Sequence, residues 1–295
     1  MYDAAKLEAE RRAVEKAIDR WLPGPDDYPE KIHEAIRYSV TGGGKRLRPI
    51  MALAATRALG LDEQSIIRCA CAIEYVHCCS LVLDDLPSMD DARLRRGRAT
   101  THRAFGVATA ILAADALLMH AFRLVADNGV TVGADGEAMA AAVRDLATAV
   151  GSYGMVGGQH VDLETASGGP IDAETLEYIQ TRKTGSLFAV AATIGGTLLG
   201  APPPSLDTLR GYAMKLGFGY QIADDILDAV GDERVVGKDV GKDQGKASFV
   251  TLHGVDAARK AANELLSAAD RSLDELEGDV SLLRAIVAHC LDRGE

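Results

Sequence analysis

One segment of the chain, from Ser65 to Leu83, is apolar around nearly the whole circumference of a helix. A helix without a polar face has to lie in the centre of a protein, where other elements cover every side. This segment runs directly into Asp84 and Asp85, and Pro87 then disfavours helical backbone at Leu86. The sequence therefore predicts a buried central helix with two adjacent carboxylates at its carboxyl end.

Carboxylates are unfavourable at that end, because the helix dipole is negative there and Asp normally caps the opposite end. The same arrangement recurs between Tyr212 and Asp228, an apolar segment that carries Asp224 and Asp225 near its end. Asp224 and Asp228 are four positions apart and therefore share a helix face. Removing an unpaired carboxylate from water costs several kcal/mol, so two such clusters indicate divalent cations between them.

The candidate metal ligands are Asp84, Asp85, Asp90, Asp224 and Asp228. A set of oxygen ligands is typical of Mg²⁺, with Mn²⁺ as the alternative, rather than of zinc. Mg²⁺ held by few protein carboxylates completes its coordination shell with water and substrate phosphate. The five cysteines include no Cys-x-x-Cys pair, which also argues against a zinc site.

Two basic clusters accompany the carboxylates. In the segment from Gly42 to Pro49, a run of glycines precedes three cations at the start of a helix, where backbone N–H groups and the dipole favour an anion. The second cluster follows the first pair of aspartates and consists of Arg93, Arg95, Arg96 and Arg98. Because guanidinium groups match phosphate oxygens, we interpret both clusters as diphosphate clamps.

Two further features each keep two interpretations. His77 lies seven positions before Asp84 on the same helix face, so it is either a hydrogen-bonded core residue or a phosphate contact. The segment from Gly237 to Lys246 repeats Gly and Lys every four residues and does not favour a helix. It is either a solvated loop or a mobile basic lid over phosphates.

Composition limits the partners and the compartment. A formal net charge of −11 argues against nucleic acid and anionic lipid. The segment from Met1 to Arg20 lacks the apolar core of a signal peptide, and the cysteines are expected to be buried thiols in a reducing cytoplasm. The uncharged stretch from Thr184 to Pro204 is long enough to span a bilayer. Its glycines favour a buried helix instead, so no stable membrane insertion is expected.

The pattern is helical nearly throughout, without sustained alternation of apolar and polar residues. The breaks between helices are short, which favours one domain over residues 1–295. The chain is therefore expected to be an all-α bundle. Helices are expected near residues 2–20, 29–41, 48–60, 63–86, 101–127, 136–155, 172–200, 205–230, 254–275 and 279–292.

Several motifs resemble, in order along the chain, those of the trans-prenyl diphosphate synthases. They are Gly42 to Pro49, Asp84 to Asp90, Arg95 to Gly97, Gly157 to Gln159, Lys183 to Gly185, and Gln221 to Asp228. The resemblance implies the isoprenoid synthase fold, a single helical bundle with a deep central pocket, usually in a homodimer. Such enzymes condense isopentenyl diphosphate with an allylic diphosphate, which is dimethylallyl, geranyl or farnesyl diphosphate.

The resemblance also implies a role for each matching residue. Mg²⁺ would be bound on one wall by Asp84, Asp85 and Asp90, and on the other by Asp224. With the metals, the residues that hold the allylic diphosphate would be Arg95, Lys183 and Lys238. The residues that hold isopentenyl diphosphate would be Lys45, Arg48, His77 and Arg96. The allylic cation, formed when the C–O bond ionises, would be faced by Gln221 and by the backbone near Lys183 and Thr184.

Product length would depend on the helix that carries the first motif, since the product grows along it, away from the metals. Farnesyl synthases that this chain resembles tend to carry a bulky aromatic residue five positions before the first Asp, where this sequence has Cys79. With Ser80 and Val76 nearby, the small side chain leaves room for another isoprene unit. A C20 product, geranylgeranyl diphosphate, is therefore expected, with farnesyl diphosphate as the alternative.

Two more remote functions use the same scaffold. A terpene cyclase usually replaces the second Asp cluster with an Asn/Ser/Glu-type triad, whereas Asp224, Asp225 and Asp228 are intact here. A non-catalytic synthase subunit typically loses one aspartate motif, and this chain has both. The sequence therefore favours a catalytic synthase over either alternative.

Overall fold

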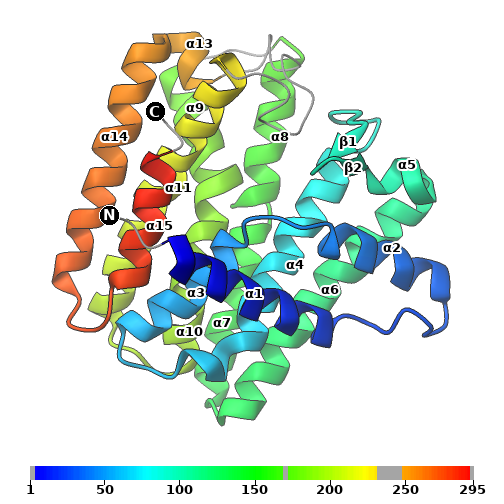
Figure 1. Ribbon diagram of the computed structural model, residues 1–295, viewed down its shortest axis with the longest axis horizontal. Helices are drawn as coiled ribbons and strands as arrows, with labels where there is room; N and C mark the ends of the chain where they lie inside the picture. The colour runs from blue at the N-terminus through cyan, green and yellow to red at the C-terminus, as the bar shows by residue number, and fades with distance from the viewer. Residues whose placement is uncertain (1–3, 169–171, 231–247, 293–295) are drawn as a thin grey trace.

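The structure is a computed structural model that describes residues 4–168, 172–230 and 248–292. It is helical almost throughout (Figure 1), so the all-α prediction is confirmed. The longer helices are α1 (Ala4–Trp21), α2 (Glu30–Thr41), α3 (Leu47–Ala58), α4 (Ile67–Asp84), α6 (Val107–Val132), α7 (Gly136–Val150), α8 (Met155–Ala166), α10 (Ser186–Leu198), α11 (Pro203–Val230), α14 (Val255–Ser272) and α15 (Ser281–Leu291). The shorter segments are η1 (Glu63–Ile66), α5 (Thr101–Phe105), α9 (Ala173–Ile179), η2 (Gln180–Gly185), α13 (Phe249–His253) and η3 (Leu273–Glu275).

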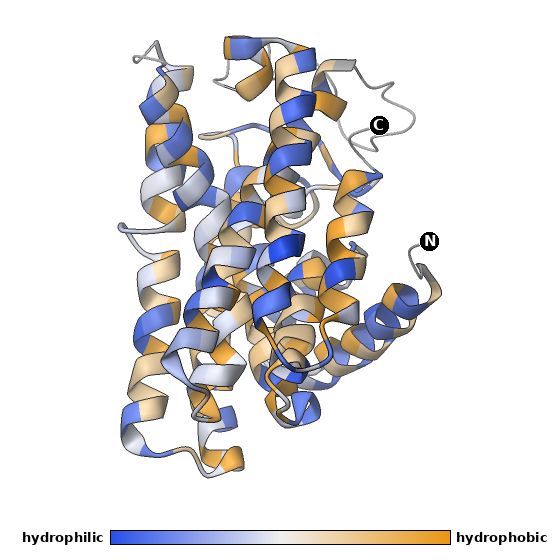
Figure 2. Ribbon diagram, turned by 90° about the vertical axis from the view of Figure 1, so that its left-hand side faces the viewer, coloured by the Kyte–Doolittle hydropathy of each residue, from blue (hydrophilic) through white to orange (hydrophobic). Residues whose placement is uncertain are grey.

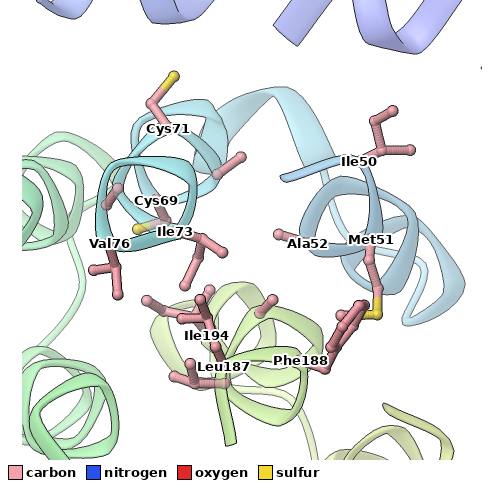
Figure 3. Packing of buried hydrophobic residues seen from close by; sticks show 14 of the residues in the cluster. Ile50, Met51, Ala52, Cys69, Cys71, Ile73, Val76, Leu187, Phe188 and Ile194 are labelled. Carbon is pink, nitrogen blue, oxygen red and sulfur yellow. The ribbon is translucent and has the colours of Figure 1, made fainter. Parts of the chain in front are cut away.

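Helix α4 lies in the core, as its apolar circumference predicted. It packs most extensively against α6 and also contacts α1, α2, α3 and α10. Figure 3 shows Ile73 of α4, Ile194 of α10 and Ala52 of α3 pointing into the space that these helices share. All three side chains are at most 1% exposed. Burial of a large aliphatic side chain stabilises the fold by about 1.5–3 kcal/mol, so α4 is a main support of the core.

The helices that bear the aspartates lie where the sequence predicted them. Helix α4 ends at Asp84, and its last turn leads into Asp85 as the cap residue. Helix α11 is described as far as Val230, with Asp224 and Asp228 in its last two described turns. The first carboxylate cluster therefore lies at the carboxyl end of its helix, and the second lies in the last described turns of α11.

The region after α6 differs from its prediction. The helix expected at 136–155 ends at Val150, and α8 begins at Met155, a helix that the sequence did not predict. A Cβ atom on Gly154 would lie 2.1 Å from the carbonyl oxygen of Ala149, so the chain turns there only because the residue is glycine. The resulting helix α8 contacts η2 and α9.

Two other expected helices are interrupted. The helix expected at 101–127 is divided at Gly106, whose φ is 89°, into α5 and α6. The helix expected at 172–200 contains the π-helical segment η2 between α9 and α10. Widened π turns inside helices are frequent at functional sites, and this one holds Lys183 and Thr184.

A short hairpin follows α4 and was not predicted. Strands β1 (Leu94–Arg95) and β2 (Arg98–Ala99) pair antiparallel, with Leu94 opposite Ala99. The two turn residues, Arg96 and Gly97, have φ values of 54° and 74°. Positive φ at both positions characterises a type I′ turn. The turn thus directs Arg96 back toward the body of the protein, where its guanidinium contacts the loop before α3.

Two described helical stretches, Glu63–Asp84 and Val107–Val132, are long and apolar enough to cross a bilayer by length and composition alone. In the most apolar 18-residue part of each stretch, 67% of the first is buried, as expected of a core helix, and 33% of the second is buried. Hydrophilic and hydrophobic residues alternate along the surface helices in Figure 2. Helix α6 nevertheless exposes large apolar side chains: Val107, Ile111, Leu112, Met119 and Val130.

Candidate active site

The first carboxylate cluster forms where α4 ends and the chain folds back. The backbone N–H of Asp90 donates to the carbonyl oxygen of Asp84 at 3.0 Å, which returns Asp90 to the end of the helix. Asp85 is only 3% exposed, and its Oδ1 accepts from Nη2 of Arg95 at 2.5 Å and from Nε at 3.1 Å. The hairpin therefore supplies a cation directly to this cluster.

The carboxylates of this cluster repel one another. Burial raises the pKa of Asp85, the bond from Arg95 acts in the opposite direction, and the charges of Asp84 and Asp90 raise it further. In the second cluster, burial raises the pKa of Asp225 to about 7, opposed mainly by a hydrogen bond from Gln221. Asp224 and Asp228 also raise it. Each cluster thus concentrates negative charge that a divalent cation would neutralise.

Gln221 and Gln180 position the second cluster. Nε2 of Gln221 donates to Oδ1 of Asp225 at 3.0 Å, and its Oε1 accepts from the hydroxyl of Thr184 at 3.0 Å. Nε2 of Gln180 lies 3.5 Å from Oδ2 of Asp225. These contacts join η2 to α11. They also fix the amide plane of Gln221, because both of its ends are engaged.

Helix α8 connects the two clusters. Nε2 of Gln159 donates to Oδ1 of Asp84 at 2.6 Å. One turn further, Asp162 accepts from Nζ of Lys183 in η2 at 2.7 Å. The helices approach closely, since a Cβ atom on Gly158 would lie 2.3 Å from the backbone nitrogen of Lys183. A chain of hydrogen bonds therefore runs from α4 through α8 and η2 to α11.

A second group of cations surrounds His77. Burial lowers the pKa of His77 well below its ordinary value, and nearby Arg48, Arg96, Arg95 and Arg46 lower it further, in that order. The imidazole is therefore neutral within a group of guanidinium charges. Arg48 lies over the ring of Phe188 with its Cζ 4.2 Å from the centroid. Converging cations around a neutral donor form a binding place for an anion.

Arg48 is within electrostatic range of both parts of the site. Burial lowers its pKa, nearby Tyr220, Glu74 and Asp224 raise it, and the charge of Arg96 lowers it. The same guanidinium therefore senses the second carboxylate cluster and the hairpin. Lys45, three residues earlier, is exposed at the start of the same segment.

The residues present fit Mg²⁺ by chemistry. Among the described residues, no three His, Cys, Asp or Glu side chains are grouped closely enough to hold a metal ion by themselves. Mg²⁺ binds through one or two carboxylates and takes the rest of its octahedral shell from water and substrate phosphates. Two carboxylate clusters beside cationic groups match that requirement, because the missing ligands would come with a diphosphate.

The remaining predicted site residues are Lys238 and the three residues expected to limit product length. Lys238, with the whole segment from Gly237 to Lys246, lies outside the described residues. Cys79 and Val76 are buried in α4, and Ser80 is partly buried. Sequence reasoning missed Gln159, Asp162 and Gln180 as site residues. The motif that contains Gln159 was the available signal, whereas Gln180 is revealed only by its contact with Asp225.

The chain matches the family described as Polyprenyl synthetase over residues 29–285. It is 38% identical over 282 residues to geranylgeranyl pyrophosphate synthase 4 of Arabidopsis thaliana, with 94% of this chain and 73% of that protein covered. It is 39% identical over 259 residues to the farnesyl diphosphate synthase of Bacillus subtilis, with 87% of each covered. These relatives span both product classes that the sequence left open.

Solved structures give the same result. The FPP/GFPP synthase of Zymomonas mobilis superposes with a TM-score of 0.85 at 34% identity, over 97% of both chains. The geranyltransferase of Helicobacter pylori, solved in complex with magnesium and isoprenyl diphosphate, has a TM-score of 0.84 at 28% identity, over 98% of this chain and 96% of that one. With both aspartate motifs in place and the fold shared over its length, this chain belongs to the polyprenyl synthetase family and is a short-chain trans-prenyl diphosphate synthase.

Proposed function

We propose that this prenyltransferase condenses isopentenyl diphosphate with an allylic diphosphate and releases geranylgeranyl diphosphate, the C20 product. One observation supports the two-substrate reaction: cations gather both at the first aspartate cluster and around His77. Arg95 is bonded to Asp85 and Lys183 to Asp162, whereas Arg48 and Arg96 are the arginines with the largest effect on the pKa of His77. A terpene cyclase needs one diphosphate site, so a second cationic group favours chain elongation.

The allylic diphosphate would bind at the aspartates. Mg²⁺, with Mn²⁺ as the alternative, would supply the positive charge that neutralises the departing diphosphate, and the geranyltransferase of Helicobacter pylori is complexed with magnesium. The residues that would hold the metal ion are Asp84, Asp85, Asp90, Asp224 and Asp228. Arg95 and Lys183 add fixed cations to this subsite, and Lys238 is proposed as a third. The primer would be dimethylallyl, geranyl or farnesyl diphosphate.

The residues of the chain then control the cation and its partner. The carbonyl oxygen of Gln221 and the oxygens around Lys183 and Thr184 would stabilise the allylic cation, since their orientation is fixed before substrate binds. Isopentenyl diphosphate would be held by Lys45, Arg48 and Arg96. His77 would donate a hydrogen bond to this substrate without adding charge. The double bond of isopentenyl diphosphate attacks the allylic cation, and loss of a proton completes the new double bond.

The small side chain of Cys79 supports the C20 product. Five residues rotate a helix by about 140° beyond a full turn, so Cys79 does not share the face of Asp84. It is 3% exposed, and burial followed by the charge of Asp115 on α6 raises its pKa to about 12. Cys79 thus lies within electrostatic range of Asp115, and a bulky residue in its place would narrow the space between α4 and α6, which pack against each other. The farnesyl synthase of Bacillus subtilis among the relatives keeps the C15 product as the second candidate.

A product-length assay tests this function. Purified enzyme, Mg²⁺ and isopentenyl diphosphate are incubated with each of the three primers, and the products are dephosphorylated and chromatographed. We expect a dominant C20 alcohol from every primer. A dominant C15 product would reject the C20 assignment, and hydrocarbon released from geranylgeranyl diphosphate alone would indicate a cyclase. Absence of condensation by the isolated chain would indicate a non-catalytic subunit.

We further propose that the enzyme is a homodimer that pairs through α6. The exposed apolar residues Ile111, Leu112 and Met119 lie along that helix, and solvated monomers seldom expose such groups together. A second copy would cover them, in keeping with the dimer that the family resemblance implies. Light scattering should give a dimer for the natural chain, and Leu112→Glu should give a monomer. A monomeric natural chain would contradict the proposal.

A reducing, cytoplasmic setting is also proposed. All five cysteines are buried thiols, which is usual for proteins kept in a reducing compartment. Neither nucleic acid nor a membrane is proposed as a partner, because of the net charge of −11. Fractionation of cells that carry the native gene would test the location, and recovery with the membrane pellet would contradict it.

A further inference from the structure

Three described residues other than glycine have a positive φ: Arg46 at 53°, Asp91 at 43° and Arg96 at 54°. Such backbone costs of the order of 1–3 kcal/mol per residue and persists only where the surroundings hold it in place. Arg46 caps the start of α3, and Arg96 turns the hairpin. Although these two residues are far apart in sequence, their guanidinium groups meet at one carboxylate, that of Glu74 in α4.

Glu74 is buried, with 1% of its surface exposed. Its Oε1 accepts a hydrogen bond from Nη1 of Arg46 and lies 4.0 Å from Nη2 of Arg96. Sγ of Cys78 lies 3.8 Å from the same oxygen. Nη2 of Arg46 donates to the carbonyl oxygen of Val40 at 2.7 Å. One carboxylate therefore contacts cations from two separate segments.

The charge on Arg46 is maintained although it is buried. Burial opposes that charge, but the carboxylate of Glu74 and further nearby negative groups raise the pKa of Arg46 above its ordinary value. One of these groups is Glu15 of α1, whose Oε1 lies 3.9 Å from Nε of Arg46. The Arg46–Glu74 contact is thus a buried ion pair with hydrogen bonds on both partners, the kind that fixes geometry.

This pair determines where the first basic cluster lies. Arg46 stands between Lys45 and Arg48 in sequence, and its side chain ties the start of α3 to the end of α2 through Val40 and to α4 through Glu74. A shift of Arg46 would carry both neighbouring cations with it. The position of Lys45 and Arg48 therefore depends on Glu74 through the backbone.

The same carboxylate holds the second basic cluster. Nη1 of Arg96 donates to the carbonyl oxygen of Gly43. Its guanidinium covers Gly44, where a Cβ atom would lie 2.6 Å from Cζ of Arg96. Arg96 is thus packed between the glycine turn and Glu74. Glu74 itself lies one helical turn before His77 in α4. Removal of the negative charge would leave several guanidinium groups facing one another.

We propose that Glu74 is a positioning residue for the isopentenyl diphosphate site, which it arranges by binding Arg46 and Arg96 without touching substrate. The inference rests on the proposed function, since it concerns one of the two diphosphate subsites. It assigns Glu74 no part in the allylic subsite, where Arg95 and Lys183 contact Asp85 and Asp162 instead. The two subsites should therefore respond differently when Glu74 changes.

The test is Glu74→Gln, which keeps the shape and removes the charge. We expect the KM for isopentenyl diphosphate to rise by about tenfold or more, the factor that corresponds to about 1.4 kcal/mol. The KM for the allylic diphosphate and kcat at saturation of both substrates should stay within about twofold. If the buried pair had only a structural role, Glu74→Gln would lower Tm but leave both KM values of the folded enzyme unchanged. That result, or an equal rise in both KM values, would overturn the proposal.

Two further variants complete the test. Glu63→Gln removes the same type of contact, an Arg57–Glu63 pair at 2.8 Å, away from the site, and should change neither KM. Arg46→Lys keeps a cation beside Glu74 but cannot bond Glu74 and Val40 together, because an ammonium lacks the guanidinium fork. It should reproduce the selective rise, and it decides the question if Glu74→Gln does not fold. If the wild-type enzyme showed no condensation activity, the proposed function itself would be rejected.

Discussion

The side-chain amide of Gln159 in α8 donates a hydrogen bond of 2.6 Å to Oδ1 of Asp84, the last residue of α4, although the two are 75 positions apart. One turn along α8, Asp162 binds Lys183. The orientation of the Asp84 carboxylate is thus set by a residue outside both aspartate motifs. Groups that orient a metal ligand in this way tune its affinity for the ion.

Replacement of Gln159 should therefore weaken metal use. Gln159→Ala is expected to raise the Mg²⁺ concentration for half-maximal activity, or to lower kcat/KM, by about 10- to 100-fold. Initial rates measured across a Mg²⁺ series provide the check. Gln64→Ala, at an exposed position in η1, is the matched control and should behave like the natural enzyme. An unchanged Mg²⁺ dependence in Gln159→Ala would show that the bond is not used when the metal is present.

The Asp162–Lys183 pair should contribute to stability. Asp162→Asn is expected to lower the free energy of unfolding by about 1–2 kcal/mol, because a charged hydrogen bond is lost but the ammonium stays partly solvated. Urea unfolding followed by circular dichroism measures the change. Glu164→Gln breaks the exposed contact with His160 on the same helix and should change stability by less than about 0.5 kcal/mol. Equal effects of the two substitutions would contradict this expectation.

Stability should fall in mild acid because of His77. Its pKa in the folded state is well below the ordinary value of 6.5, first through burial and then through nearby arginines. Below about pH 6.5 the unfolded chain binds a proton at this position and the folded chain does not, so stability rises with pH in that window and levels off above it. His77→Asn should reduce the slope by up to about 1.4 kcal/mol per pH unit.

Urea unfolding of both proteins between about pH 5 and pH 7.5 measures this slope, since the window follows from the unfolded pKa. If the slope is the same with and without His77, then the imidazole is not held neutral in the folded protein.

The side chain at position 79 should control product length. Cys79→Tyr is expected to shift the main product from C20 to C15, because the ring would fill space between α4 and α6. Cys79→Ser, which keeps the small size, should leave the C20 product dominant. Chromatography of dephosphorylated products compares the two variants. An unchanged profile in Cys79→Tyr would exclude this residue as the limit on chain growth.

Metal and diphosphate should stabilise the enzyme together. A ligand at about 100 times its Kd stabilises the folded state by about 2.7 kcal/mol, so Mg²⁺ with inorganic diphosphate should raise Tm. Mg²⁺ without diphosphate should do so much less, because the carboxylates supply only part of its shell. Asp84→Ala and Asp224→Ala should each reduce the joint shift, as measured by differential scanning calorimetry. A full shift in both variants would remove these residues as ligands.

Local pattern was sufficient for the helices that carry the chemistry. The apolar circumference of α4 and the proline after it determine both its burial and its end at Asp84. The spacing of Asp224 and Asp228 in α11 follows from the same periodicity. These features depend on residues within a few turns of one another, so the sequence alone predicts the two carboxylate clusters and the choice of Mg²⁺ over zinc.

Glu74 shows what such patterns leave open. A lone acid within an apolar helix already indicates a buried charge, but its partners Arg46 and Arg96 lie on other segments. Their contact requires two left-handed backbone positions that neither residue type favours. Likewise, α8 packs against η2, a contact that local periodicity does not encode, and from there Gln159 reaches Asp84. The sequence by itself determined the two helices that bear the aspartates, and the carboxylates on them, through short-range periodicity. The tertiary structure alone decided which distant side chains orient them, since those contacts depend on how helices pack.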